Sequence, residues 1–185
     1  VPVVQMDSVI GNKSGKVLLT MFSRNTNLLL AFLRDHNTAR SVLDVFNDLY
    51  AMFGRETYCR LFPVILTDRG SEFSNPVPIE QDENDELRSL VFYCNPSAPY
   101  QKGGIEVAHE LVRRVLPKGK SFDDLQQEDI DLMLSHINSY KRGKLNSRSA
   151  YQLFNFIYGD DILPKLNIRE IEANDIVLSP KLLKK

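Results

Sequence analysis

One apolar stretch constrains the fold more than any other part of this chain. The stretch from Phe62 to Thr67 is apolar at nearly every position and ends at Asp68, which opens a turn with Arg69 and Gly70. A continuous apolar run without alternation is typical of a strand that is buried on both faces. Such a strand lies inside a sheet that carries helices on both sides. The chain is therefore predicted to be an α/β protein.

The other predicted strands suggest that the sheet is mixed. Three strands are predicted before the apolar run, at residues 2–8, 16–23 and 27–33. The turn-forming segments Asn12-Lys13-Ser14-Gly15 and Arg24-Asn25-Thr26 separate them, so these strands are expected to form an antiparallel meander. A further strand is predicted at residues 91–94, after a polar surface hairpin or loop over residues 74–90.

Helices are predicted in the remaining segments. The first begins after an N-cap at Thr38 and runs at helical spacing to Gly54, and a connector is expected over residues 55–61. Later helices are predicted at residues 126–141 and 149–158. A last strand-like run, residues 175–178, precedes a basic tail.

The helix predicted from Gly104 to Leu116 has two distinct faces and is stopped by Pro117. Its apolar face contains Val107, Ala108, Leu111, Val112 and Val115. Its opposite face contains Glu106, His109, Glu110 and Arg113. The Glu106 carboxylate is therefore expected to point away from the buried side of the helix.

Composition limits the class of protein. The 185 residues are 43% hydrophobic and 25% charged, as in one ordinary soluble domain, and no apolar stretch reaches membrane-spanning length. The net charge of −1 argues against a dedicated nucleic-acid-binding module. Basic clusters at 113–120, 141–148 and 181–185 fit either contact with DNA or an ordinary mixed surface. Cys59 and Cys94 form no metal motif and are expected to be free thiols.

Three acidic residues stand at ends of predicted elements. Asp7 closes the apolar run Val3–Met6, Asp68 closes the central strand, and Glu106 lies in the first turn of a helix. Taken alone, Asp68 fits a common turn and Glu106 fits a first-turn acid that complements the helix dipole. Converged carboxylates repel one another and are stabilised by a hard dication such as Mg²⁺. Together the three residues favour a metal-dependent catalytic site.

Two sequence motifs carry a resemblance to a known family. They are Thr67-Asp68-Arg69-Gly70-Ser71-Glu72-Phe73 and Ala98-Pro99-Tyr100-Gln101-Lys102-Gly103-Gly104-Ile105-Glu106. Further matches lie at Leu116–Gly119 and Asn138–Arg142. Over residues 3–158 the chain resembles the catalytic core of DDE transposases and retroviral-type integrases. Within that family it is most similar to bacterial insertion-sequence transposases that carry a helix-turn-helix region ahead of an integrase-core domain.

The resemblance implies both a fold and an activity. The fold is ribonuclease H-like, with a five-stranded mixed sheet flanked by helices. The activity is DNA cleavage and strand transfer through two Mg²⁺ or Mn²⁺ ions. Asp7 would bridge both ions, Asp68 would hold one, and Glu106 would hold the other. The chain departs from the family pattern at Arg69, Val107 and Ala108, which bears on DNA positioning more than on metal binding.

Several residues around this site are candidates for contact with DNA. They are Arg69, Tyr100, Gln101, Lys102, His109, Arg113, Arg114 and Lys118. Each has a simpler interpretation. His109 could be a solvated residue on a polar helix face, the basic residues could be an ordinary charged helix end, and the segment 100–102 could be a plain helix-entry loop.

The resemblance also predicts the domain organisation and the partners. Residues 1–160 would form the catalytic core, and residues 161–185 a C-terminal extension with a short strand and a basic tail. A DNA-binding region is expected ahead of this chain, which begins with Val. The protein would act on element ends and target DNA as a homo-oligomer in the bacterial cytoplasm, associated with the nucleoid and not with a membrane. The alternatives are a catalytically silent, transposase-derived DNA-binding protein and an assembly domain.

Overall fold

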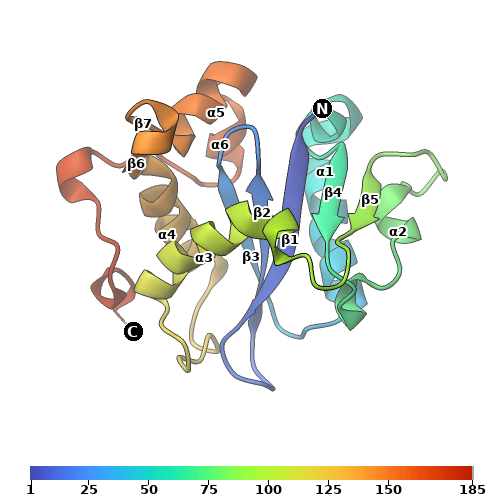
Figure 1. The fold of residues 1–185 in the computed structure, drawn as a ribbon, viewed down its shortest axis with the longest axis horizontal. Coiled ribbons are helices and arrows are strands. Elements are labelled where there is room, and N and C mark those ends of the chain that lie inside the picture. Colours follow the sequence, from blue (N-terminus) through green and yellow to red (C-terminus); the bar gives the residue numbers. More distant parts are fainter. Residues whose placement is uncertain (185) are drawn as a thin grey trace.

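A five-stranded sheet forms the centre of the computed structural model, which describes residues 1–184 apart from the side chain of Lys144. The strands are β1 (Val3–Ile10), β2 (Val17–Ser23), β3 (Leu29–Arg34), β4 (Val64–Thr67) and β5 (Leu90–Tyr93). Their order is β3-β2-β1-β4-β5 (Figure 1). Strands β1, β2 and β3 pair antiparallel, whereas β4 pairs parallel with both β1 and β5. The predicted mixed sheet with an antiparallel meander is confirmed.

Helices cover both faces of this sheet (Figure 1). The longer helices are α1 (Ala39–Leu61), α3 (Gly103–Val115), α4 (Gln127–Ser139) and α5 (Ala150–Tyr158). The shorter elements are α2 (Val77–Glu80), α6 (Ile162–Lys165), β6 (Lys141–Arg142) and β7 (Arg148–Ser149). Helix α3 contacts β1 and β2, and α4 contacts β3. Within residues 1–184, no helix is both long enough and apolar enough to cross a membrane.

Helix α1 is longer than the sequence predicted. Thr38 is its N-cap, as expected, and its side chain accepts a hydrogen bond from the backbone N–H of Ser41. Gly54 adopts a non-helical conformation, with φ 77° and ψ 166°, but only kinks the helix. The predicted connector at residues 55–61 is wrong. This segment is helical because Tyr58 and Leu61 are buried in the core, so its packing outweighs the break at Gly54.

The strand predicted at residues 175–178 is also wrong. The chain there forms a 3₁₀ turn, η4 (Ala173–Asp175), and then runs extended without pairing to the sheet. Its backbone is bonded to α4 instead, because Nδ1 of His136 accepts a 2.9 Å hydrogen bond from the N–H of Val177. The apolar run in this segment therefore lies against a helix and does not pair with a neighbouring strand.

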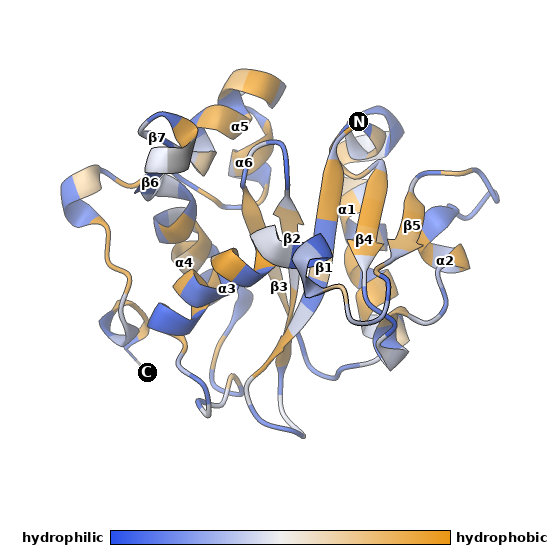
Figure 2. Ribbon diagram, viewed as in Figure 1, coloured by the Kyte–Doolittle hydropathy of each residue, from blue (hydrophilic) through white to orange (hydrophobic). Residues whose placement is uncertain are grey.

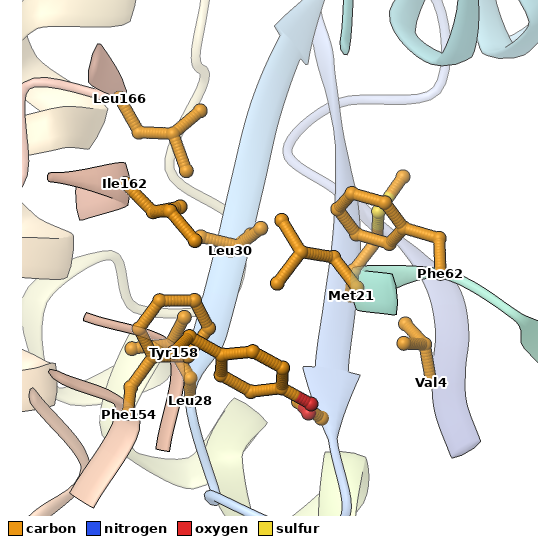
Figure 3. A pocket seen from close by; sticks show the side chains of 11 residues that line it. Val4, Met21, Leu28, Leu30, Phe62, Phe154, Tyr158, Ile162 and Leu166 are labelled. Carbon is orange, nitrogen blue, oxygen red and sulfur yellow. The ribbon is translucent and has the colours of Figure 1, made fainter. Parts of the chain in front are cut away.

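The core lies between the sheet and its helices. Figure 2 shows hydrophobic residues concentrated along the strands. A narrow gap of about 20 Å³ remains where α5 and α6 meet the sheet, and Figure 3 shows its carbon-rich lining. The labelled residues are Val4, Met21, Leu28, Leu30, Phe62, Phe154, Tyr158, Ile162 and Leu166. A space of this size holds little more than one water molecule, so the gap is a packing seam and not a ligand site.

The edge strand β3 is tied to α4 by a buried amide. Oδ1 of Asn138 accepts a 2.9 Å hydrogen bond from the N–H of Leu29, and its Nδ2 donates a 2.8 Å hydrogen bond to the carbonyl of the same residue. Asn138 is fully buried. Its side chain therefore satisfies backbone groups that an edge strand would otherwise leave without partners.

Candidate active site

Strand register brings two of the predicted acidic residues together. Gln5 on β1 pairs in parallel with Leu66 on β4, so two residues further along, Asp7 and Asp68 lie side by side. A 3.2 Å hydrogen bond from Thr67 Oγ1 to the carbonyl of Met6 continues the contact between the strands. Asp68 follows the last residue of β4, whereas Asp7 lies inside β1, which continues to Ile10. Asp7 therefore lies in β1, and Asp68 lies directly after the neighbouring central strand β4.

The two aspartates share one cation from the protein itself. Nζ of Lys102 lies 3.1 Å from Oδ2 of Asp7 and 3.5 Å from Oδ2 of Asp68. It also donates a 3.2 Å hydrogen bond to the carbonyl of Met6. The Oδ1 atoms of the same two carboxylates accept 2.8 Å hydrogen bonds from backbone N–H groups, of Ser8 and of Gly70 respectively. Each aspartate is thus oriented by a nearby backbone N–H group and directs its remaining oxygen to the shared ammonium.

Glu106 lies at the same cavity but does not complete a cluster. An open cavity of about 460 Å³ is lined by Asp7, Asp68, Lys102 and Glu106. Within the part of the chain that the structure describes, no three Asp, Glu, His or Cys side chains are grouped closely enough to hold a metal ion. Two hard carboxylate oxygens around one cation suit Mg²⁺, which often has few protein ligands. The site therefore fits a divalent ion at the two aspartates, with Glu106 available from the cavity wall.

Gln5 positions the helix that carries Glu106. Its Oε1 accepts a 2.8 Å hydrogen bond from the N–H of Ile105, and its Nε2 donates a 3.2 Å hydrogen bond to the carbonyl of Gln101. Helix α3 approaches the sheet so closely that a Cβ atom on Gly104 would lie 2.4 Å from Cε1 of Phe22. The start of α3 is therefore fixed relative to β1, the strand that also carries Asp7.

His109 is part of this packing. Its Nε2 lies 2.8 Å from Oγ1 of Thr20, and that hydroxyl donates a 3.1 Å hydrogen bond to the carbonyl of Asp7. Because the hydroxyl proton is directed to Asp7, Nε2 of His109 is the donor to Thr20. Burial, opposed by the charge of Asp7, lowers the pKa of His109. The interpretation of His109 as a merely solvated residue is wrong, because this hydrogen bond and the partial burial of the ring tie α3 to the sheet.

The structure divides the predicted DNA contacts into exposed and internal residues. Tyr100 is 79% exposed, and Arg114 and Lys118 are also exposed. Arg69 lines the cavity, with its guanidinium 5.5 Å from the ring centre of Tyr93. These four candidates are exposed at the surface.

The other candidates are held by protein groups. Lys102, a predicted DNA contact, is only 7% exposed, because its ammonium is held by two carboxylates. Oε1 of Gln101 accepts a 2.7 Å hydrogen bond from the N–H of Asn95. Nη2 of Arg113 donates a 3.2 Å hydrogen bond to the carbonyl of Ile10, and burial lowers its pKa.

Sequence reasoning missed a polar network behind Asp7. Oγ of Ser8 donates a 2.9 Å hydrogen bond to Oε1 of Glu72 and accepts a 3.1 Å hydrogen bond from Nη2 of Arg34. Burial, opposed by the charge of Glu72, lowers the pKa of Arg34 to about 10. The sequence did contain a signal for this network, because Arg34 ends an apolar strand and a buried arginine needs polar partners from elsewhere in the fold.

Both cysteines are free, as predicted. Cys94 lines the cavity, and burial raises the pKa of its thiol, so the neutral thiol is favoured there. A neutral thiol is a poor metal ligand. Cys94 therefore adds no charge to the site.

Curated relatives of the chain are integrases and transposases by name, although no protein-family model matches it. A protein named as an integrase, ORF3 of Spiroplasma virus SpV1-R8A2 B, is 28% identical over 151 residues, covering 82% of this chain and 45% of that protein. The transposase for insertion sequence element IS4351 of Bacteroides fragilis is 23% identical over 151 residues, covering 82% and 44%. Transposase InsI for insertion sequence element IS30A of Escherichia coli K12 is 22% identical over 147 residues, covering 80% and 36%. The chain spans less than half the length of these relatives.

Solved structures with a similar fold include retroviral integrase cores. The catalytic core domain of BIV integrase superposes with a TM-score of 0.56 at 22% identity, covering 84% of this chain and 92% of that one. A chain of the simian T-cell lymphotropic virus intasome, solved with PP2A regulatory subunit B56 gamma, gives 0.59 at 17% identity, covering 92% and 58%. The fold is therefore ribonuclease H-like, and the predicted resemblance to the transposase and integrase core is confirmed.

Proposed function

We propose that this chain is the catalytic core of a DNA transposase or integrase that cleaves and joins DNA strands with Mg²⁺ or Mn²⁺. The observation that carries the proposal is the convergence of Oδ2 of Asp7 and Oδ2 of Asp68 on one cation. An ion pair between solvent-exposed carboxylates and a cation stabilises a protein only slightly, since the charges are well solvated. Two carboxylates directed at one point of an open cavity are instead typical of a site built for a cation of higher charge.

Three acidic residues would hold the metal. In this proposal Asp7 would be a ligand of both ions, Asp68 of one and Glu106 of the other. When bound, a pair of Mg²⁺ ions supplies an activated water or DNA 3′-hydroxyl and stabilises the leaving oxygen. The chain's own contribution is placement. The strand register aligns the two aspartates, and Gln5 fixes the start of α3 on which Glu106 stands.

DNA would approach along the exposed side of the cavity. Arg69 lines the cavity, while Tyr100, Arg114 and Lys118 are exposed beyond or along α3. Cationic and aromatic side chains of this kind bind phosphate and stack on bases without reading sequence. We therefore assign recognition of the element ends to a region outside this chain, and catalysis to a homo-oligomer assembled on DNA in the cell interior.

The proposal is tested with Asp68→Asn in the full-length protein. We expect loss of Mg²⁺- and Mn²⁺-dependent cleavage and joining of DNA that carries the element ends, because the amide removes a charged metal ligand. Asp68 is half exposed, so the melting temperature should stay nearly unchanged. The matched control is Asp160→Asn, a surface carboxylate outside the cavity. Full activity of Asp68→Asn would remove this residue from the mechanism, and a large drop in melting temperature would make its role structural.

A further inference from the structure

We propose that Lys102 is an internal cation that holds Asp7 and Asp68 together before metal binds, and that its ammonium then turns into the cavity to meet a DNA phosphate. This inference rests on the proposed function, and it adds a positioning residue to it. In the metal-free protein, Lys102 would hold the carboxylate oxygens of Asp7 and Asp68 in place. After a metal ion has taken over these oxygens, the lysine ammonium would bind the DNA substrate.

The charges around Lys102 support the first state. Within residues 1–184, the ion pairs made by Asp7 and by Asp68 are both with Lys102, at 3.1 and 3.5 Å. Without the ammonium, two carboxylates on neighbouring strands would face each other and repel. Burying a lysine to 7% exposure is costly unless the charge is paired, and here it is paired twice. Lys102 therefore contributes to the order of the metal-free site.

The ammonium and a metal ion cannot share this position. Mg²⁺ binds oxygen at about 2.0–2.1 Å and repels a neighbouring cation. The ammonium occupies the same Oδ2 atoms at a longer distance and carries one positive charge for two carboxylates. A dication compensates both carboxylates. Lys102 must therefore leave these oxygens when a divalent ion takes its place.

The backbone around Lys102 limits how it can leave. The carbonyl of Gln101 and the N–H of Ile105 are both bonded to the Gln5 side chain, and Gly104 is packed against Phe22. The main chain on both sides is thus fixed to the sheet. The lysine side chain is long and flexible, so rotation about its methylene groups is the available movement.

The released ammonium would face the substrate. Lys102 lines the same 460 Å³ cavity as the three acidic residues. A side chain that rotates away from Asp7 and Asp68 therefore places its charge in the space where DNA must enter. A phosphodiester oxygen suits a lysine ammonium that has lost its carboxylate partners.

The first test measures metal affinity without any reaction. Mn²⁺ binding to the full-length protein is followed by electron paramagnetic resonance of the free ion, for wild type, Lys102→Met and Lys102→Arg. We expect Lys102→Met to bind Mn²⁺ about fivefold more tightly, since a competing partly screened ion pair is worth about 1 kcal/mol. Lys102→Arg should bind more weakly than wild type, because a guanidinium fork holds carboxylates more firmly. Lys13→Met, which removes the same charge from an exposed turn, should behave as wild type.

The second test follows the lysine to DNA. The salt dependence of DNA binding is measured with Ca²⁺, which occupies oxygen sites, and again in a chelator. With Ca²⁺, Lys102→Met should reduce the slope of log K against log salt by about 1, as expected for one lost phosphate contact. In the chelator the slope should match wild type.

The outcomes separate this inference from the proposed function. If Lys102→Met binds Mn²⁺ no more tightly than wild type, the exchange of the Lys102 ammonium for a metal ion is overturned. The proposed function still stands in that case, provided that Asp68→Asn loses cleavage. Absence of Mn²⁺ binding in wild type and in Lys102→Met alike would overturn the exchange, whereas full cleavage activity of Asp68→Asn would overturn the proposed function. An equal reduction of the salt slope with and without Ca²⁺ would place Lys102 on DNA permanently, and would contradict its release.

Discussion

Replacing Gly104 with alanine should destabilise the protein, although alanine is the better helix former. The new Cβ would lie 2.4 Å from Cε1 and 3.0 Å from Cδ1 of Phe22, whose ring is 3% exposed and has little room to shift. Overpacking of this kind costs about 1–3 kcal/mol, and the gain in helix propensity offsets at most about 1 kcal/mol. We expect a net loss of roughly 1–2 kcal/mol and a melting temperature lower by about 2–8 °C.

The neighbouring residue provides the control. A Cβ added at Gly103 meets no heavy atom within 4 Å, outside its chain neighbours and its own helix backbone. Gly103→Ala should therefore leave stability unchanged or raise it by up to about 1 kcal/mol. Thermal and urea unfolding of the two variants compares the same chemical change at adjacent positions of one helical turn.

A second substitution and an activity assay examine the cause. Phe22→Leu removes the ring atoms that the new methyl group would meet, so it should recover part of the stability lost in Gly104→Ala. The rate of DNA cleavage by Gly104→Ala should fall by more than the loss of folded protein explains, because the clash pushes α3, with Glu106, away from β1. Equal melting temperatures for the Gly103 and Gly104 variants would refute this account of the helix–sheet contact.

Three further outcomes follow from contacts elsewhere in the fold. Asn138→Ala should cost about 1–3 kcal/mol in urea unfolding, because it leaves the buried backbone N–H and carbonyl of Leu29 without their partner. Burial lowers the pKa of His136 below its ordinary value of 6.5, so the stability that neutral His136 contributes should be lost as the pH falls below 6.5. In His136→Asn, the side-chain Oδ1 can still accept the hydrogen bond from the N–H of Val177, and the free energy of unfolding should depend less on pH between pH 7 and 5. The isolated chain, with net charge −1, should bind specific and scrambled DNA equally weakly in a salt titration, and tight selective binding would place end recognition within this chain.

Local patterns were sufficient to predict the strands near the two aspartates, whereas the five-stranded sheet was implied by the family resemblance. The apolar run that ends at Asp68 becomes β4, and parallel pairing with β1 places Asp7 beside it. Asp7 lies inside β1 and not at its carboxyl end, so its position beside Asp68 depends on the parallel register of β1 and β4. The assignment of Asp7, Asp68 and Glu106 as the catalytic residues remains a prediction.

The position of Lys102 could not be predicted in the same way. A lysine beside two glycines in a polar loop is ordinarily solvated. Its burial depends on carboxylates from two strands and on Gln5, all distant in sequence. Gly54 is a second example, since a local helix-stop signal was outweighed by the burial of Tyr58 and Leu61. Both errors arose where tertiary contacts outweighed a local preference.

The last residues of the chain have a practical consequence for how it can be shortened. The 3₁₀ turn η5 (Pro180–Leu183) contacts both α3 and α4, and Leu183 is buried there. A fragment that stops at residue 160 would expose the outer sides of these two helices, including the one that carries Glu106. Exposed apolar helix surface promotes aggregation. A soluble fragment intended for crystallisation or screening should therefore extend at least to Leu183.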